Sequence, residues 1–86
     1  MMAMQILYFA WLRERIGLSE ERVDPPSGTA SVADLVRWLR SRGAGYAEAL
    51  AETARVRCAV NQDFATPDAH ISDGDEIAFF PPITGG

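Results

Sequence analysis

The sequence predicts a small α+β domain, with a mixed sheet of four to five strands and helices packed on one face of that sheet. Three observations support this prediction. Short apolar segments at residues 4–9 and 76–80 open and close the domain, as strands in the middle of a sheet do. Between them, the region from Ser31 to Gly43 has the spacing of an amphipathic helix. This order favours a β-grasp arrangement, in which the first and last strands are central and parallel and the long helix crosses the sheet.

The first part of the chain contains two strand signals and a short helix signal. Met4–Phe9 alternates between two faces, with Met4, Ile6 and Tyr8 on one face and Leu7 and Phe9 on the other. Trp11–Ile16 predicts a short helix that ends at Gly17. Glu20–Val23 predicts a weak strand that pairs with the first one as a hairpin-like unit. The prolines and glycine of Asp24–Gly28 predict a loop.

The long helix has a clear start and a clear stop. Ser31 can cap its N-terminus, and Asp34 can return the hydrogen bond or favour the positive end of the helix dipole. Gly43 ends the helix. Apolar residues recur at helical spacing and form one buried stripe, which consists of Val32, Leu35, Val36 and Leu39. Arg37 and Arg40 face away from that stripe.

The second half of the chain predicts a weaker helix and three more strands. The helix runs from Tyr46 to Ala54, with an apolar side made by Ala47, Leu50 and Ala51. Val56–Val60 alternates as a half-buried strand, and Phe64–Ala65 predicts a very short one. Asp73–Gly74 is a strong turn signal. Glu76–Phe80 is the last strand, with Ile77 and Phe79 on one face and Ala78 and Phe80 on the other.

The charge distribution excludes some classes of function. The net charge is −4, from eight basic and twelve acidic residues, which argues against a nucleic-acid binder. Arg57 is the last basic residue, so the final third of the chain carries acids alone: Asp63, Asp68, Asp73, Asp75 and Glu76. If these acids surround the root of the C-terminal tail, they form a docking face that speeds association with basic partners. A solvated acidic loop is the alternative.

The remaining reactive side chains do not predict a catalytic or metal site. The single cysteine, Cys58, indicates a reducing cytoplasm, and its strand pattern favours a buried core thiol. The only histidine, His70, matches no ligand spacing with the acids near it, so no metal is expected. Glycine-rich phosphate loops are absent, so any ATP would be bound by a partner. No segment has the pattern of a membrane span or a signal peptide.

The stretch after the last strand has the features of a working tail. Pro81 and Pro82 lack the N–H groups that extend a sheet, and they start the tail in a stiff direction. Gly85 and Gly86 make a tip thin enough for a channel that excludes any Cβ atom. The group delivered is the Gly86 carboxylate, which ATP would activate to an acyl-adenylate. A sulfur donor would then give a thiocarboxylate, or an amine would give an amide.

The chain therefore divides into a β-grasp domain at residues 1–80 and a flexible functional tail at residues 81–86. Alternation in the last strand places Phe80 on the opposite face from Ile77 and Phe79. If Ile77 and Phe79 seal the core, Phe80 is exposed beside the tail, where an aromatic side chain is typical of a partner anchor.

Several segments resemble the small subunits of molybdopterin synthase, which are ubiquitin-like sulfur carriers. Supporting segments are residues 8–10, 12–14, 32–35 and 60–62. The most specific segment is the last one, residues 73–86, which reads Asp-Gly-Asp-Glu-Ile-Ala-Phe-Phe-Pro-Pro-Ile-Thr-Gly-Gly. These segments span nearly the whole chain at similar spacings. The resemblance implies a ubiquitin-like β-grasp fold, in agreement with the element order.

The resemblance also implies a function and two partners. A partner similar to ubiquitin-activating enzyme would use ATP to adenylate Gly86, which then becomes a thiocarboxylate. The large synthase subunit would take in the tail and pass the sulfur to cyclic pyranopterin monophosphate, which builds the dithiolene of molybdopterin. Two carriers on a dimer of large subunits is the usual assembly, and the carrier itself binds no cofactor and is no enzyme alone. The partner-binding residues would be Phe80, Pro81, Pro82, Ile83, Thr84 and Gly85.

Two other functions remain open. A sulfur carrier of the thiamine pathway shares the fold and the Gly-Gly end, although Pro81–Pro82 after two phenylalanines favours the molybdopterin type. A ubiquitin-like modifier that forms isopeptides belongs to a different class. The chain contains no lysine, so it cannot form such bonds with itself through side-chain amines.

Overall fold

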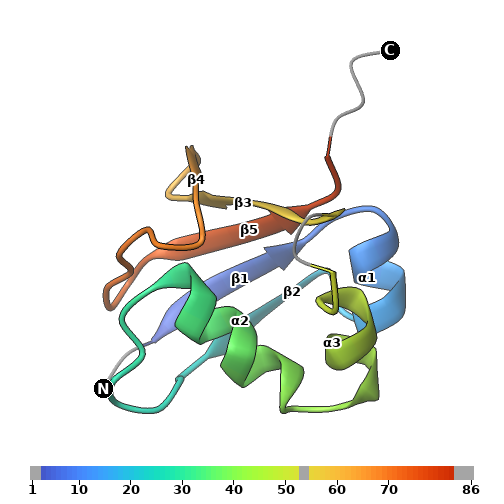
Figure 1. Ribbon diagram of the computed structural model, residues 1–86, viewed down its shortest axis with the longest axis horizontal. Helices are drawn as coiled ribbons and strands as arrows, with labels where there is room; N and C mark the ends of the chain where they lie inside the picture. The colour runs from blue at the N-terminus through green and yellow to red at the C-terminus, as the bar shows by residue number, and fades with distance from the viewer. Residues whose placement is uncertain (1–2, 53–54, 83–86) are drawn as a thin grey trace.

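The computed structural model describes residues 3–52 and 55–82, while residues 1–2, 53–54 and 83–86 lie outside the described part. Within it, strands and helices follow one another in the predicted order (Figure 1). They are β1 (Met4–Tyr8), α1 (Trp11–Ile16), β2 (Glu20–Val23), α2 (Val32–Arg40), α3 (Ala44–Ala49), β3 (Arg57–Val60), β4 (Asp63–Ala65) and β5 (Glu76–Phe80). No helix of these ranges is both long enough and apolar enough to cross a membrane.

The strands form one mixed sheet in the order β2-β1-β5-β3-β4. β1 and β5 are parallel neighbours at its centre, with Ile6 opposite Ile77 and Tyr8 opposite Phe79. β2 pairs antiparallel with β1, and β3 pairs antiparallel with both β5 and β4. Figure 1 shows α2 crossing the strands, with α1 and α3 side by side near one end of the sheet. The predicted β-grasp arrangement is confirmed.

One face of the sheet forms the core. Alternate residues of the two central strands are at most 1% exposed, namely Met4, Ile6, Tyr8, Ile77 and Phe79. α2 covers them with the predicted stripe, of which only Val36 is half-buried. The rings of Tyr8 and Phe79 stack with centroids 6.2 Å apart. Since burying one large apolar side chain contributes about 1.5–3 kcal/mol, these contacts join the two ends of the chain firmly.

α2 begins with the capping box that the sequence predicts. The Asp34 N–H donates to Ser31 Oγ at 3.2 Å, and Asp34 Oδ2 accepts from the Ser31 N–H at 3.2 Å and the Ala30 N–H at 3.0 Å. The hydrogen bond from Ala30, followed by that from Ser31, holds the pKa of the Asp34 carboxyl below its usual range. The box fixes where α2 starts, and therefore how its apolar stripe meets the sheet.

The third helix differs from the prediction. It spans Ala44–Ala49 rather than residues 46–54, and Ala51, predicted on its apolar side, is exposed. Gly45 lies inside the helix, although glycine lowers helix propensity. A Cβ atom at this position would lie 2.5 Å from the Arg15 carbonyl oxygen of α1. The helix thus starts earlier than its local pattern indicates, and the glycine in its first turn lets α1 and α3 approach closely.

A polar cluster joins β2 to the helices. The Glu21 carboxylate accepts hydrogen bonds from Tyr8 Oη at 2.8 Å, Tyr46 Oη at 2.7 Å and Arg42 Nη1 at 3.0 Å. Burial alone would raise the pKa of Glu21, but these three donors together hold it below its usual value. Burial and the bond to the carboxylate raise the pKa of Tyr46 to about 12. One charged carboxylate therefore connects both strands of the β1–β2 pair to α3 and to the loop after α2.

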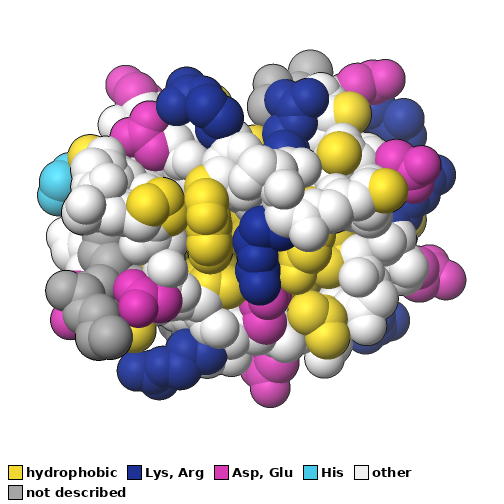
Figure 2. All heavy atoms as spheres, turned by 90° about the horizontal axis from the view of Figure 1, so that it is seen from below, with side chains coloured by type: hydrophobic (Ala, Val, Ile, Leu, Met, Phe, Trp, Pro, Cys, Tyr) yellow, Lys and Arg dark blue, Asp and Glu magenta, His cyan; other side chains and the backbone are white. Residues whose placement is uncertain are grey.

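Arginine side chains partly cover the apolar surface on the helix side. Figure 2 shows the molecule from below the view of Figure 1, with exposed hydrophobic side chains in the middle and arginines directly against them. Arg42 makes contacts of this kind, with its guanidinium carbon 5.0 Å from the ring centroid of Trp38 and 5.1 Å from that of Tyr46. Such stacking shields aromatic surface from water and adds a cation–π attraction.

Replacing Gly45 with alanine should destabilise the fold, because the new Cβ atom would collide with the Arg15 carbonyl oxygen and push α1 and α3 apart. We expect the free energy of unfolding, measured with urea, to fall by about 1–3 kcal/mol, the usual cost of overpacking. Gly43→Ser is the matched control, since a Cβ atom at residue 43 meets nothing closer than 3.8 Å and serine is a good N-cap. Unchanged stability of Gly45→Ala would contradict the close approach.

The Glu21 cluster predicts sensitivity to acid. A glutamate whose pKa is lower in the folded state stabilises the fold above its unfolded pKa, about 4.3, and this stabilisation is lost as the pH falls through the folded pKa. Glu21→Gln should reduce stability at neutral pH by about 2 kcal/mol, the scale of hydrogen bonds to a charged group. It should also flatten the decline of stability in acid.

Urea unfolding at a series of pH values measures both effects. Glu48→Gln is the control, because Glu48 is exposed on α3 and its replacement removes the same charge. If wild type and Glu21→Gln lose stability in parallel as the pH falls, the Glu21 carboxylate is not the group responsible.

Candidate functional site

The C-terminal tail starts at the end of a central strand. β5 ends at Phe80, which is half-buried and lies opposite Arg57 of β3. Pro81 and Pro82 are half-buried and no longer belong to the sheet, as their missing N–H groups require. The other predicted tail residues lie outside the described residues; they are Ile83, Thr84, Gly85 and Gly86. The tail therefore leaves from a strand that is bonded on both sides (Figure 1).

The second face of the sheet, here called the open face, carries exposed aromatic side chains. It consists of the residues that alternate with the core ones. Its apolar members are Leu7, Ala59, Phe64, Ala78 and Phe80, and its polar members are Gln5, Glu20, Arg22, Arg57 and Glu76. The described helices cover the opposite face (Figure 1). Phe64 is 81% exposed, and its ring centroid lies 5.9 Å from that of Phe80. Phe9, one residue beyond β1, is 47% exposed. Exposed apolar groups gathered in this way are typical of partner surfaces.

The turn between β3 and β4 presents Phe64. Asn61 has a positive φ of 51°, which asparagine tolerates better than most residues. Its Nδ2 donates to Asp75 Oδ1 at 3.0 Å, and its Oδ1 accepts from the Glu76 N–H at 3.0 Å. The turn is therefore anchored to the start of β5. The sequence predicted the short strand but not the outward ring of Phe64, since two residues of alternation are too few to assign a face.

The acidic residues nearest the tail in sequence are not near it in space. Glu76 begins β5 and residues 73–75 precede it, so they lie at the far end of the strand from Phe80. Asp73 Oδ1 accepts a hydrogen bond from the Ala3 N–H at 2.7 Å, which ties the turn to the start of β1. The predicted docking face required the acids to surround the tail root, and Asp73, Asp75 and Glu76 do not. A strand advances by about 3.3 Å per residue, so the length of β5 separates these acids from the tail root.

Cys58 is a core residue, as predicted. It is 7% exposed, and its Sγ donates to the Ala65 carbonyl oxygen at 3.4 Å. Burial raises the pKa of the thiol, which keeps it protonated and a weak nucleophile. His70 forms an isolated bridge with Ser31. Among residues 3–52 and 55–82, no three side chains of His, Cys, Asp or Glu are grouped so as to hold a metal ion.

The sheet order, the crossing helix and the tail root define a ubiquitin-like β-grasp protein. Residues 6–86 match the ThiS family, and the chain belongs to that family. It is 38% identical over 82 residues to the molybdopterin synthase sulfur carrier subunit of Escherichia coli (strain K12), covering 95% of this chain and 98% of that protein. The resemblance seen in the sequence is confirmed.

Solved structures share the fold over nearly their whole length. The putative molybdopterin converting factor, subunit 1, from Pyrococcus furiosus has a TM-score of 0.79 at 29% identity, covering 96% of this chain and 100% of that one. SAMP1 from Haloferax volcanii, a small archaeal modifier protein, has a TM-score of 0.73 at 30% identity, covering 98% and 99%. The fold is thus similar to proteins described both as a molybdopterin factor and as a modifier.

Proposed function

We propose that the chain is the sulfur-carrier subunit of a molybdopterin synthase. An ATP-dependent partner adenylates the Gly86 carboxylate and releases pyrophosphate. A sulfur donor then displaces AMP to give a thiocarboxylate. Two such thiocarboxylates in turn each give one sulfur to cyclic pyranopterin monophosphate, which builds the molybdopterin dithiolene, and each Gly86 returns to a carboxylate by hydrolysis. The observation that most directly supports the proposal is the tail root, which leaves a central strand at Phe80 beside the exposed ring of Phe64.

The geometry of the tail root suits a carrier. β5 is bonded to β1 on one side and to β3 on the other, so the point from which the tail extends is fixed. Residues 81–86 can reach about 20 Å at roughly 3.3 Å per residue. We infer that this tail is flexible in the isolated protein and becomes ordered in a partner's channel. Ordering it costs about 1–2 kcal/mol per residue, which hydrogen bonds and a cation for the terminal anion would offset.

The chain supplies a reacting group rather than a catalytic site. A carboxylate with a reference pKa of about 3.5 is ionised at neutral pH and is a poor electrophile, so Gly86 depends on adenylation elsewhere. In this proposal the chain is not an enzyme by itself and binds no cofactor, and ATP belongs to an adenylyltransferase that is similar to ubiquitin-activating enzyme. The setting is the cytoplasm, as the single cysteine indicates.

The open face is the proposed docking surface for the large synthase subunit. Its exposed ring, Phe64, touches Phe80, and Phe80 leads directly into Pro81 and Pro82. A partner that covers this face would therefore receive the tail at the edge of the same interface. Both the large subunit and the adenylyltransferase need the tail, so they bind one carrier in turn. The assembly would be a heterotetramer with two copies of each synthase subunit.

A protein modifier is the second candidate function, favoured by the similarity to SAMP1. Both functions start with the same adenylate and differ in what captures it. Sulfur yields a thiocarboxylate, whereas a lysine of another protein yields an isopeptide. A thiamine-pathway carrier would share the thiocarboxylate but would not support molybdopterin formation with the large subunit.

Changing the C-terminus should abolish the chemistry and leave the fold intact. Deleting Gly86 shortens the tail, and adding one residue after it lengthens the tail. In both cases the terminal carboxylate no longer lies at the position where the activating enzyme adenylates it. We expect no thiocarboxylate by mass spectrometry after incubation with the activating enzyme, ATP and a sulfur donor. The melting temperature should stay unchanged, and Cys58→Ser should still form the thiocarboxylate. Thiocarboxylate on the chain that lacks Gly86 would refute the assignment.

Removing the exposed ring of Phe64 or the half-buried ring of Phe80 should weaken binding to the large subunit. Phe64→Ser and Phe80→Ala should each cost more than about 1 kcal/mol of binding free energy, the scale of an interface hot spot, measured by calorimetry. Phe64→Ser should leave the melting temperature nearly unchanged, because the ring is 81% exposed. Trp38→Ala, which removes an aromatic side chain from the helix side, is the control and should bind normally. Normal binding by both phenylalanine variants would place the interface elsewhere.

A further inference from the structure

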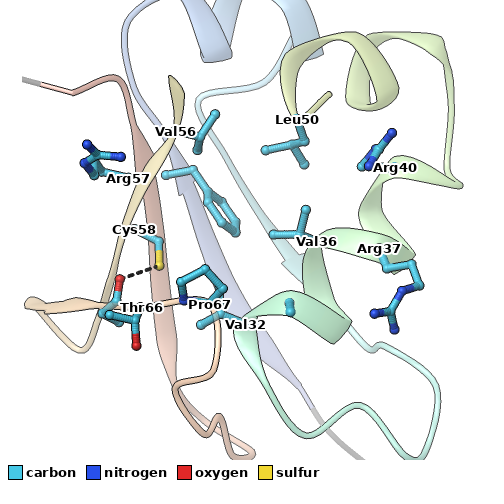
Figure 3. A pocket seen from close by; sticks show the side chains of 13 residues that line it. Val32, Val36, Arg37, Arg40, Leu50, Val56, Arg57, Cys58, Thr66 and Pro67 are labelled. Carbon is cyan, nitrogen blue, oxygen red and sulfur yellow. Dashed lines mark hydrogen bonds between the residues drawn. The ribbon is translucent and has the colours of Figure 1, made fainter. Parts of the chain in front are cut away.

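A groove with a volume of about 570 Å³ lies between α2 and the β3–β4 pair, on the helix side of the sheet. Figure 3 shows Val32, Val36 and Leu50 on one side of it and Cys58 and Pro67 on the other. It is separate from the open face, and the function proposed above makes no use of it. Close-packed interiors leave few voids larger than a water molecule, and this volume is within the range of small-molecule pockets.

The floor of the groove is apolar and belongs to the core. Phe79 and Leu50 are each 1% exposed, and Val32 is 3% exposed. On the side formed by β3 and β4, Cys58 Sγ is held by its hydrogen bond to the Ala65 carbonyl oxygen (Figure 3). These side chains have almost no surface left to cover, so a ligand would bury its hydrocarbon or aromatic body against other lining residues, the half-buried Val36 and Val56 and the exposed Pro67.

The charge around the groove is positive, although the chain carries more acids than bases. Arg37, Arg40 and Arg57 line it, and no acidic side chain does so among the described residues. Figure 3 shows the Arg57 guanidinium directed away from the groove, which leaves Arg37 and Arg40 of α2 on its rim. Arg37 pairs with Asp34 at 3.2 Å. Arg40 has no hydrogen bond or ion pair to any described residue, so its charge is available to a ligand.

Backbone groups along the groove already have partners. The Val32 N–H donates to the Ala69 carbonyl oxygen at 3.0 Å, and the Ala33 N–H donates to that of Pro67 at 2.8 Å. Cys58 is paired with Ala65 in the β3–β4 ladder. Recognition by added strand pairing, which an extended peptide would use, therefore has little backbone to engage on the α2 and β3 walls, and the edge strand β4 is three residues long. We propose that the groove binds a small organic anion, with its apolar body against Val36, Val56 and Pro67 and its acid group at Arg40.

Anilinonaphthalene sulfonate is a suitable probe, since it joins an aromatic body to one sulfonate and fluoresces in apolar sites. The full chain should bind one probe molecule, and Arg40→Gln should weaken binding roughly tenfold, the scale of a charge-assisted hydrogen bond. Arg13→Gln removes the same charge from exposed α1 and is the matched control.

The alternative binding place for such a probe is the open face, and Phe64→Ser tests it. The proposal predicts unchanged probe affinity in Phe64→Ser and loss in Arg40→Gln. The reverse pattern would assign the probe to the open face and overturn the proposal. Arg40 is exposed and unpaired among the described residues, so Arg40→Gln should fold normally. Its melting temperature checks this before the probe affinity is measured.

Discussion

The parallel pairing of β1 with β5 is the interaction on which the rest of the structure depends. It joins segments from opposite ends of the chain, with Gln5 opposite Glu76, and it leaves β5 between β1 and β3. A shift of one residue in this register would turn Ile77 and Phe79 out of the core. The same register turns Phe80 toward the open face. Core packing and the position of the tail root are thus two results of one constraint.

Local sequence patterns predicted the elements whose faces differ strongly in burial. The alternation in Met4–Phe9 and Glu76–Phe80 gave the correct core faces, because each strand has one covered side and one open side. The Ser31 capping box was also predicted correctly, since its two partners are three residues apart and need no other part of the fold. Of the candidate site, the sequence located Phe80, Pro81 and Pro82 for the same local reasons.

The features that the sequence did not reveal depend on contacts between distant segments. The close approach of Gly45 in α3 to the Arg15 carbonyl oxygen depends on the position of α1, which no property of residues 44–49 alone expresses. Phe64 lies in a strand of three residues, and its exposure follows from pairing with Ala59 at the sheet edge. The acids before β5 were assigned to the tail root because they are close to it in sequence. In the fold they lie at the start of β5, and the extended strand separates them from the tail root at its other end. The groove beside α2 likewise combines α2, β3 and the segment after β4, and so has no local signature.

The central position of β5 also bears on how the protein is made. Chains are synthesised from the N-terminus, so β3 and β4 exist before the strand that connects them to β1 and β2. Until β5 is available, the sheet remains in two parts and the core lacks Ile77 and Phe79. A shortened chain without β5 would therefore leave its core open between β1 and β3, and chains that stay unfolded are removed by cellular proteases. Chains that complete the core therefore contain β5, the strand that leads directly into Pro81 and Pro82.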